Sequence, residues 1–241
     1  MSEEFDTPSA EYKSLSWSEV WINALTKPSV ATYERLVHDP GASANKAYLW
    51  VFICALIGYV FSSLIGLAIG GLFDGGMFAG FNNSYLFGSW FIQLICCLPI
   101  VAILAVVGLV ISAGITQLIA RALGGTGTYS ELVYANAAYG APISLVSGIL
   151  FTVPFVNLCL GIPLAIYSLV LTVIAVNAVN QLGWGKAIVA AFIVPVAITV
   201  FVICGAIAVI SGLALTGPQI GDVFSDIVRE LSTPTAGMIL R

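Results

Sequence analysis

The chain has 241 residues, of which 59% are hydrophobic and only 8% are charged, and its mean hydropathy is +1.03. Soluble domains contain about 25% charged residues, so this composition excludes an ordinary soluble domain and predicts an integral membrane protein. A charge at the centre of a bilayer costs at least about 3 kcal/mol, so charges inside the apolar region should mark loops or membrane edges. Between residues 47 and 221 these charges are Asp74, Arg121, Glu131 and Lys186.

Residues 1–15 are predicted to form a disordered polar tail, which lacks the basic start and short apolar core of a cleavable signal peptide. Residues 16–46 are predicted to form amphipathic cytoplasmic or interfacial helices, with a capping box at Ser16 and Glu19. We favour an interfacial location in which Trp17 and Trp21 anchor the segment at the level of the lipid headgroups. The alternative is that both helices pack on the protein's own cytoplasmic surface.

The apolar region predicts an all-α bundle of about five transmembrane helices in residues 47–216. The spans are expected at about 47–72, 90–120, 132–153, 156–180 and 187–215. The second stretch is too long for one crossing, so we expect Pro99 to kink or interrupt it. A glycine- and asparagine-rich loop is expected at 73–85, and a tight turn at 153–157. Residues 217–241 are expected to form an external C-terminal tail with a short helix at 222–231.

The basic residues predict the orientation of the bundle. Lys27, Arg35, Lys46, Arg121 and Lys186 fall on the N-terminal side of a five-span bundle, whereas loop 73–85 and turn 153–157 contain no Lys or Arg. Cytoplasmic loops of membrane proteins carry an excess of these residues, so we expect the N-terminus in the cytoplasm and the C-terminus outside.

Small residues predict where the helices approach each other closely. Gly58, Ser62, Gly66 and Gly70 recur every four residues in the first span, and we favour packing within one chain over dimerisation. In the third span we expect Gly140 to face a neighbouring helix at a point where only a small side chain fits.

A polar group in the third span allows two interpretations. Asn136, Tyr139, Gly140 and Pro142 are consistent with hydrogen bonds between helices and a proline kink, which we favour. A broken helix that lines a small cavity, as in transporters, is the alternative. Asn177 and Asn180, near the end of the fourth span, are expected to bond across to this group.

The sequence contains none of the motifs that we associate with catalysis or metal binding. It has no GxSxG, HExxH or Walker-type loop, and GGTGT at 124–128 lacks the following Lys of a phosphate-binding loop, so we expect a flexible reverse turn there. His38 has no metal partner at ligand spacing, and cysteines 54, 96, 97, 159 and 204 are expected to be free thiols. We therefore predict no catalytic residue, cofactor or metal site, and no enzyme activity.

Three segments resemble one known family of membrane proteins. They are GGTGTYSELVYANAAYGAPISLV, NQLGWGKAIVAAFIVP and ALTKPSVATYERLVHDPGAS, which together cover about residues 21–211. Their order and spacing are similar to those of Yip1-domain proteins, in particular the prokaryotic members. The resemblance implies a five-span bundle with a cytoplasmic N-terminus and no enzymatic activity; the eukaryotic members associate with Rab GTPases and with one another and influence membrane shape.

We expect the protein to act as a membrane organiser or scaffold in a prokaryotic cytoplasmic membrane. Its expected partners are the lipid bilayer and other membrane proteins or further copies of itself, and neither nucleic acid nor metal. Two alternatives stay open: an accessory subunit of a larger respiratory or photosynthetic membrane complex, and, with less support, a facilitator of small neutral solutes.

Overall fold

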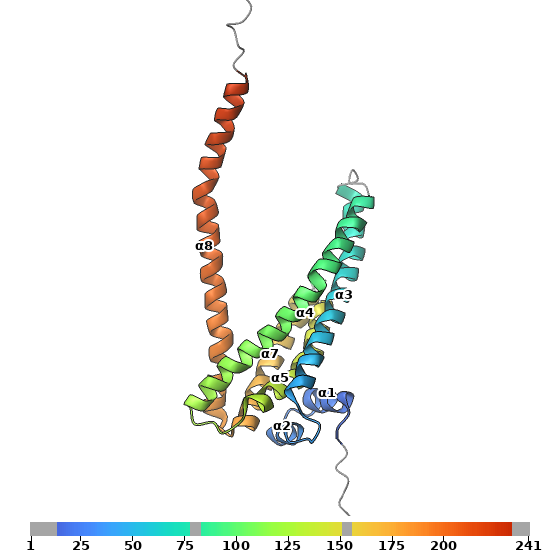
Figure 1. Cartoon of the computed structure of the whole chain (residues 1–241), viewed down its shortest axis with the longest axis vertical. Helices are drawn as coiled ribbons and strands as arrows, with labels where there is room; N and C mark the ends of the chain where they lie inside the picture. Colours follow the sequence, from blue (N-terminus) through green and yellow to red (C-terminus); the bar gives the residue numbers. More distant parts are fainter. Residues whose placement is uncertain (1–13, 78–82, 151–155, 233–241) are drawn as a thin grey trace, which may run out of the picture. The chain divides into compact units, whose positions relative to one another are not determined.

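The computed structural model describes residues 14–77, 83–150 and 156–232, and every regular element in these ranges is a helix (Figure 1). The chain divides into two compact units, residues 1–194 and residues 195–241. The first unit contains all the helix-to-helix packing discussed below. The second unit consists, in its described part, of the continuation of α8 (Trp184–Ser232). The all-α membrane architecture is therefore as predicted.

Two short helices form a layer at one end of the first unit (Figure 1). α1 (Trp17–Thr26) begins with the predicted capping box, in which the Ser16 hydroxyl accepts from the amide of Glu19. α2 (Val30–Val37) is capped by the Ser29 hydroxyl, which accepts from the amide of Thr32. Their apolar faces are buried against the protein's own helices. Packing on the protein's own helices is the alternative given in the sequence analysis; the residues buried are Val20, Ala24, Tyr33, Leu36 and Val37.

The long helices differ from the expected spans at several boundaries. α3 (Ala44–Met77) and α4 (Asn83–Ala122) both extend into the predicted loop at 73–85, and α4 runs through Pro99 without a break. Helix α8 likewise continues through the GPQIG sequence, which we expected to end the fifth span before a separate short helix. At Pro99, which lies within the apolar stretch Leu94–Ala122, a continuous helix satisfies backbone groups that lipid cannot, and this outweighs the local cost of proline. The structure offers no such reason for the continuation of α8 beyond Gly212.

Four of the described helices are long and apolar enough to cross a membrane, over Ala44–Gly66, Leu94–Ala122, Cys159–Asn180 and Trp184–Gly212. α5 (Tyr129–Leu150) corresponds to the expected third span and is not among the four. Its first half is buried inside the protein, from Leu132 to Ala141, so its side chains face other helices instead of lipid. A helix in that position can carry tyrosine and asparagine without exposing them to hydrocarbon.

α5 is the centre of the first unit. It contacts α1, α2, α3, α4 and α7 (Ile162–Asn180), as well as the single π-helical turn η1 (Asn157–Gly161) that precedes α7. The predicted turn at 153–157 falls mostly outside the described residues. The arrangement brings three sets of side chains together near the α1–α2 end: a polar clasp, an aromatic cluster and a notch lined by basic residues.

Candidate functional site

The loop between α4 and α5 is held by hydrogen bonds at both ends. The amide of Gly125 donates to the carbonyl of Ala120 at 2.8 Å, and the amide of Thr126 donates to the carbonyl of Asn180 at 3.3 Å. Gly127 is buried, and a Cβ atom there would overlap the carbonyl oxygen of Val179. The interpretation of GGTGT as a flexible reverse turn is therefore wrong: its glycines let the loop lie directly on the end of α7.

A pair of buried amide side chains closes this clasp. Nε2 of Gln117 donates to Oδ1 of Asn180 at 3.0 Å, and Nδ2 of Asn180 donates back to Oε1 of Gln117 at 3.2 Å. Nε2 of Gln117 also donates to the carbonyl of Gly127 at 2.6 Å. Gln117 is 4% exposed and Asn180 is 1% exposed, so each amide depends on the other for its hydrogen bonds. We call Gln117, Asn180 and the loop 124–128 the polar clasp.

The turn from α7 into α8 adjoins the polar clasp. Oδ1 of Asn177 accepts from the amide of Gly183 at 2.9 Å, and Gln181 adopts a left-handed backbone with φ of 52° at the end of α7. Nζ of Lys186 donates to the carbonyl of Leu123 at 3.0 Å. We had expected Asn177 and Asn180 to bond to the group around Asn136. Among the described residues they instead form hydrogen bonds with the loops at this end.

Inside the bundle, the predicted polar group of α5 makes a hydrogen-bonded contact with α7. The hydroxyl of Tyr139 lies 3.2 Å from Oδ1 of Asn136 and 2.8 Å from Oγ1 of Thr172. Thr172 in turn donates to the carbonyl of Ser168 at 2.8 Å. α5 continues through Pro142, so this helix is not broken. These contacts are those of the favoured interpretation, hydrogen bonding between helices.

Of the glycines predicted to make close helix contacts, Gly58 makes one and Gly140 does not. A Cβ atom at Gly140 would meet nothing within 4 Å, so the prediction of a close contact there is wrong. A Cβ atom at Gly148 of α5 would lie 3.2 Å from the carbonyl oxygen of Gly58 in α3. Gly66 is exposed, and the surroundings of Gly70 lie outside what the structure describes. The stripe of small residues in α3 thus makes its described close contact at Gly58.

The predicted tryptophan anchors belong to an aromatic cluster. The rings of Trp17 and Trp21 each meet that of Trp50 in α3 edge-on, with centroids 5.9 Å apart, and Trp50 lies 5.2 Å from Tyr134 in α5. Trp50 is 1% exposed, whereas Trp17 is 41% exposed. The buried Nε1 atoms of Trp21 and Trp50 have no hydrogen-bond partner among the described residues. This cluster fixes α1 to the start of α3, a role that the sequence analysis did not foresee for Trp50.

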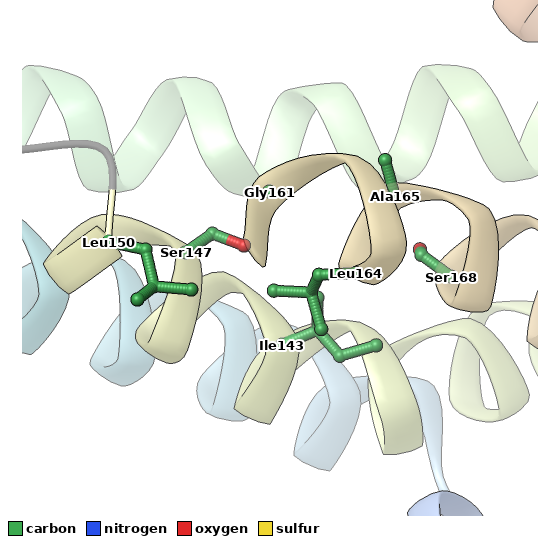
Figure 2. A pocket seen from close by; sticks show the side chains of 7 residues that line it. All are labelled: Ile143, Ser147, Leu150, Gly161, Leu164, Ala165 and Ser168. Atoms are coloured by element: carbon green, nitrogen blue, oxygen red, sulfur yellow. The ribbon is translucent and has the colours of Figure 1, made fainter. Parts of the chain in front are cut away.

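A cavity of about 150 Å³ lies between α5 and the η1–α7 segment. Figure 2 shows the side chains that line it. Its lining is apolar apart from two hydroxyl groups, which belong to Ser147 and Ser168. Asn136 lines neither this cavity nor the notch between α1 and α2, so neither of these two pockets corresponds to the polar cavity of the transporter interpretation.

The described residues contain no group of three His, Cys, Asp or Glu side chains placed to hold a metal ion. All five cysteines are free; Cys54 is buried, and the other four are exposed or half-buried. What the site offers chemically is hydrogen bonding between paired amides and hydroxyls, aromatic packing, and positive charge at one end.

We compared the chain with models of known protein families. The model of the Yip1 domain matches residues 22–232. The chain belongs to the Yip1 family. The match runs from within α1 to the end of α8, so it includes the polar clasp and, of the aromatic cluster, Trp50 and Tyr134. No curated protein and no solved structure matched the chain. The Yip1 family is a family of membrane proteins that is not known for enzymes.

Several residues of this end were missed by the sequence analysis. Asn180 was considered only as a partner of the polar group in the third span. Gln117 lies 63 residues away from it, and no local pattern pairs the two. The signal that was available is the GTG sequence at 125–127, because alternating glycines in a short loop indicate close approach of the backbone.

Proposed function

We propose that this Yip1-family protein is a non-enzymatic membrane organiser, which acts by packing its helices against other membrane proteins or against further copies of itself. The observation that supports this most is how the polar groups are used. Gln117 bonds to Asn180, and Tyr139 bonds to Asn136 and Thr172, so these groups hold the bundle together. Intramembrane groups that carry substrates or protons are typically charged or line a cavity.

The outward surface of the helices offers the means of association. Along α4, large apolar side chains are exposed over several turns, namely those of Ile95, Ile103, Leu104, Val107, Ile111 and Leu118. Such a surface contacts lipid in a single copy and packs against another apolar helix in an assembly. Association between membrane helices depends on this shape-based packing, because lipid is as apolar as the side chains.

We further propose that the N-terminus lies in the cytoplasm of a prokaryotic cell and the C-terminus outside. The location of the basic residues supports this orientation. The α1–α2 layer and the α4–α5 loop lie at the same end of the helices (Figure 1), and the start of α8 is tied to the end of α4 by Lys186. This end carries five of the eight Lys and Arg residues of the chain: Lys27, Arg35, Lys46, Arg121 and Lys186.

Reconstitution into liposomes tests the function. Copies labelled with donor and acceptor dyes should show energy transfer that persists on dilution with lipid, beyond the level expected for random encounters. The same liposomes should pass glycerol and urea no faster than protein-free liposomes. Energy transfer at the random level together with solute flux above background would overturn the proposal in favour of a facilitator.

A variant pair makes this test specific to helix packing. Ile103→Ala combined with Ile111→Ala shortens exposed side chains of α4, and Leu49→Ala combined with Ile57→Ala does the same in α3. Association through helix faces predicts that at least one pair lowers energy transfer while both keep the parent's helix content. Purification of the parent chain from native membranes in fixed stoichiometry with a respiratory or photosynthetic complex would favour the accessory-subunit alternative instead.

A further inference from the structure

A notch of about 290 Å³ opens between the last turn of α1 and the first two turns of α2. It is lined by Asn23, Lys27, Ala31, Thr32 and Arg35. Asn23 and Lys27 come from α1 and the residue that ends it, and the other three come from α2. Because α1 and α2 are packed on the bundle through their apolar faces, the notch has a fixed frame.

The lining of the notch is suited to an anion. Lys27 and Arg35 are both exposed, and within the part of the chain that the structure describes neither forms an ion pair. Asn23 adds an amide and Thr32 a hydroxyl, and no carboxylate is among the lining residues. Arg presents several donors in a planar fork that matches a phosphate, and Lys adds a compact positive charge.

The notch also lies close to where the chain enters the membrane. α3, the first membrane-spanning helix, begins at Ala44, nine residues after Arg35. Trp17 in α1 keeps 41% of its surface exposed, as expected for a ring at the level of lipid headgroups. Anionic phospholipids attract basic segments next to a membrane span, and each Lys or Arg near such a surface contributes about a fivefold gain in binding.

We propose that this notch binds the phosphate group of an anionic phospholipid headgroup, held by Lys27 and Arg35. The site does not depend on the organiser function proposed above. It would fix the α1–α2 layer against the surface of one leaflet, so that the layer contacts both the bundle and the lipid.

Native mass spectrometry of the full-length protein in detergent, titrated with phosphatidylglycerol, tests the site. Lys27→Gln combined with Arg35→Gln should weaken binding at least about tenfold, because two charges next to the phosphate are lost. The matched control, Lys46→Gln combined with Arg121→Gln, removes the same charge from the same end outside the notch and should stay within about twofold of the parent. Lys27→Arg with Arg35→Lys should retain binding.

Other ligands give the outcomes that would overturn the proposal. Phosphatidylcholine should bind weakly to parent and variants alike, and inorganic phosphate should compete with phosphatidylglycerol only at much higher concentration. Competition by inorganic phosphate at the same concentration as the lipid would assign the notch to a soluble anion. Equal loss of lipid binding in the control pair would show a diffuse charge effect. A gain in lipid binding on removing residues 1–13, which carry four acidic side chains, would assign the notch to the chain's own tail.

Discussion

At the scale of single residues, the polar clasp shows why two amides are buried together at the end of an apolar bundle. A buried amide without a partner costs about 1–3 kcal/mol, so neither Gln117 nor Asn180 is tolerable alone at its position. Together they satisfy each other, and Gln117 also bonds to the carbonyl of Gly127. The pair thereby ties α4, the α4–α5 loop and α7 to each other at one point.

Asn180→Ala should lower the free energy of unfolding by about 1–3 kcal/mol, because it leaves Gln117 buried without one of its partners. Gln117→Ala should have a comparable effect. The double variant should cost clearly less than the sum of the two, since the second substitution removes the orphaned group. Denaturant unfolding in detergent measures all three variants, and strictly additive losses would show that the two amides do not act as a pair.

Two glycines give a matched contrast in backbone packing. At Gly127 a methyl group would overlap the backbone of Val179, whereas at Gly140 it would meet nothing within 4 Å. We expect Gly127→Ala to destabilise the protein by about 1–3 kcal/mol. Gly140→Ala should be neutral or stabilise it by up to about 1 kcal/mol, since alanine is the better helix former. Melting temperatures in the same detergent compare them, and a larger loss for Gly140→Ala would contradict the described packing.

At the scale of elements, the α1–α2 layer is attached through aromatic side chains. Tyr33 of α2 is fully buried, its hydroxyl donates to the carbonyl of Ala24 at 3.3 Å, and its ring meets that of Tyr139 edge-on at 6.3 Å. The hydroxyl of Tyr167 in α7 donates to the carbonyl of Leu25. Both short helices are thus joined to the bundle by hydrogen bonds as well as by apolar packing.

This attachment predicts a dependence of stability on pH. Burial raises the pKa of the Tyr33 hydroxyl well above its ordinary value, because the phenolate would lose its hydration; Tyr139 and Tyr167 nearby act in the same direction. The folded chain therefore keeps this proton above about pH 10, where the unfolded chain releases it. The stabilising effect is complete below that pH and falls as the pH rises further, by up to about 1.4 kcal/mol per pH unit.

Tyr33→Phe is the variant that isolates this effect. Comparing unfolding at pH 8 and pH 11, we expect the parent to lose more stability than Tyr33→Phe, because phenylalanine has no proton to release. The conservative change also removes the bond to Ala24, so the variant should be less stable by about 1 kcal/mol at pH 8. Parallel pH profiles for the two proteins would show that Tyr33 is not buried as described.

The short helices could be predicted in detail from the sequence, and the long ones only in outline. Caps such as Ser16 with Glu19 are local, so their hydrogen bonds follow from spacing alone. Pro99 gave a misleading signal within α4, because in lipid a helix persists where it would end in water. The clasp between Gln117 and Asn180 is not visible in the sequence, since it depends on how distant helices meet.

At the scale of the whole molecule, α5 explains why hydropathy alone finds four membrane helices among the described residues where five are expected. Its first half is surrounded by other helices of the first unit, so it can be less apolar than a lipid-facing span. We propose that α5 crosses the membrane as well, which would make five spans and would put the polar clasp, the α1–α2 layer and the basic notch on the side of the N-terminus. This topology is our central claim, because the proposed orientation of the two termini depends on it.

Labelling of single cysteines with a membrane-impermeant maleimide in sealed vesicles tests this claim most directly. In a background without the five native cysteines, Thr126→Cys should react only from the N-terminal side of the membrane, and Ser84→Cys only from the opposite side. Thr152→Cys, in the segment between α5 and η1, should also react only from that opposite side if α5 crosses fully. The five-span topology would be wrong if the cysteines at residues 84 and 152 reacted from the same side as the cysteine at residue 126.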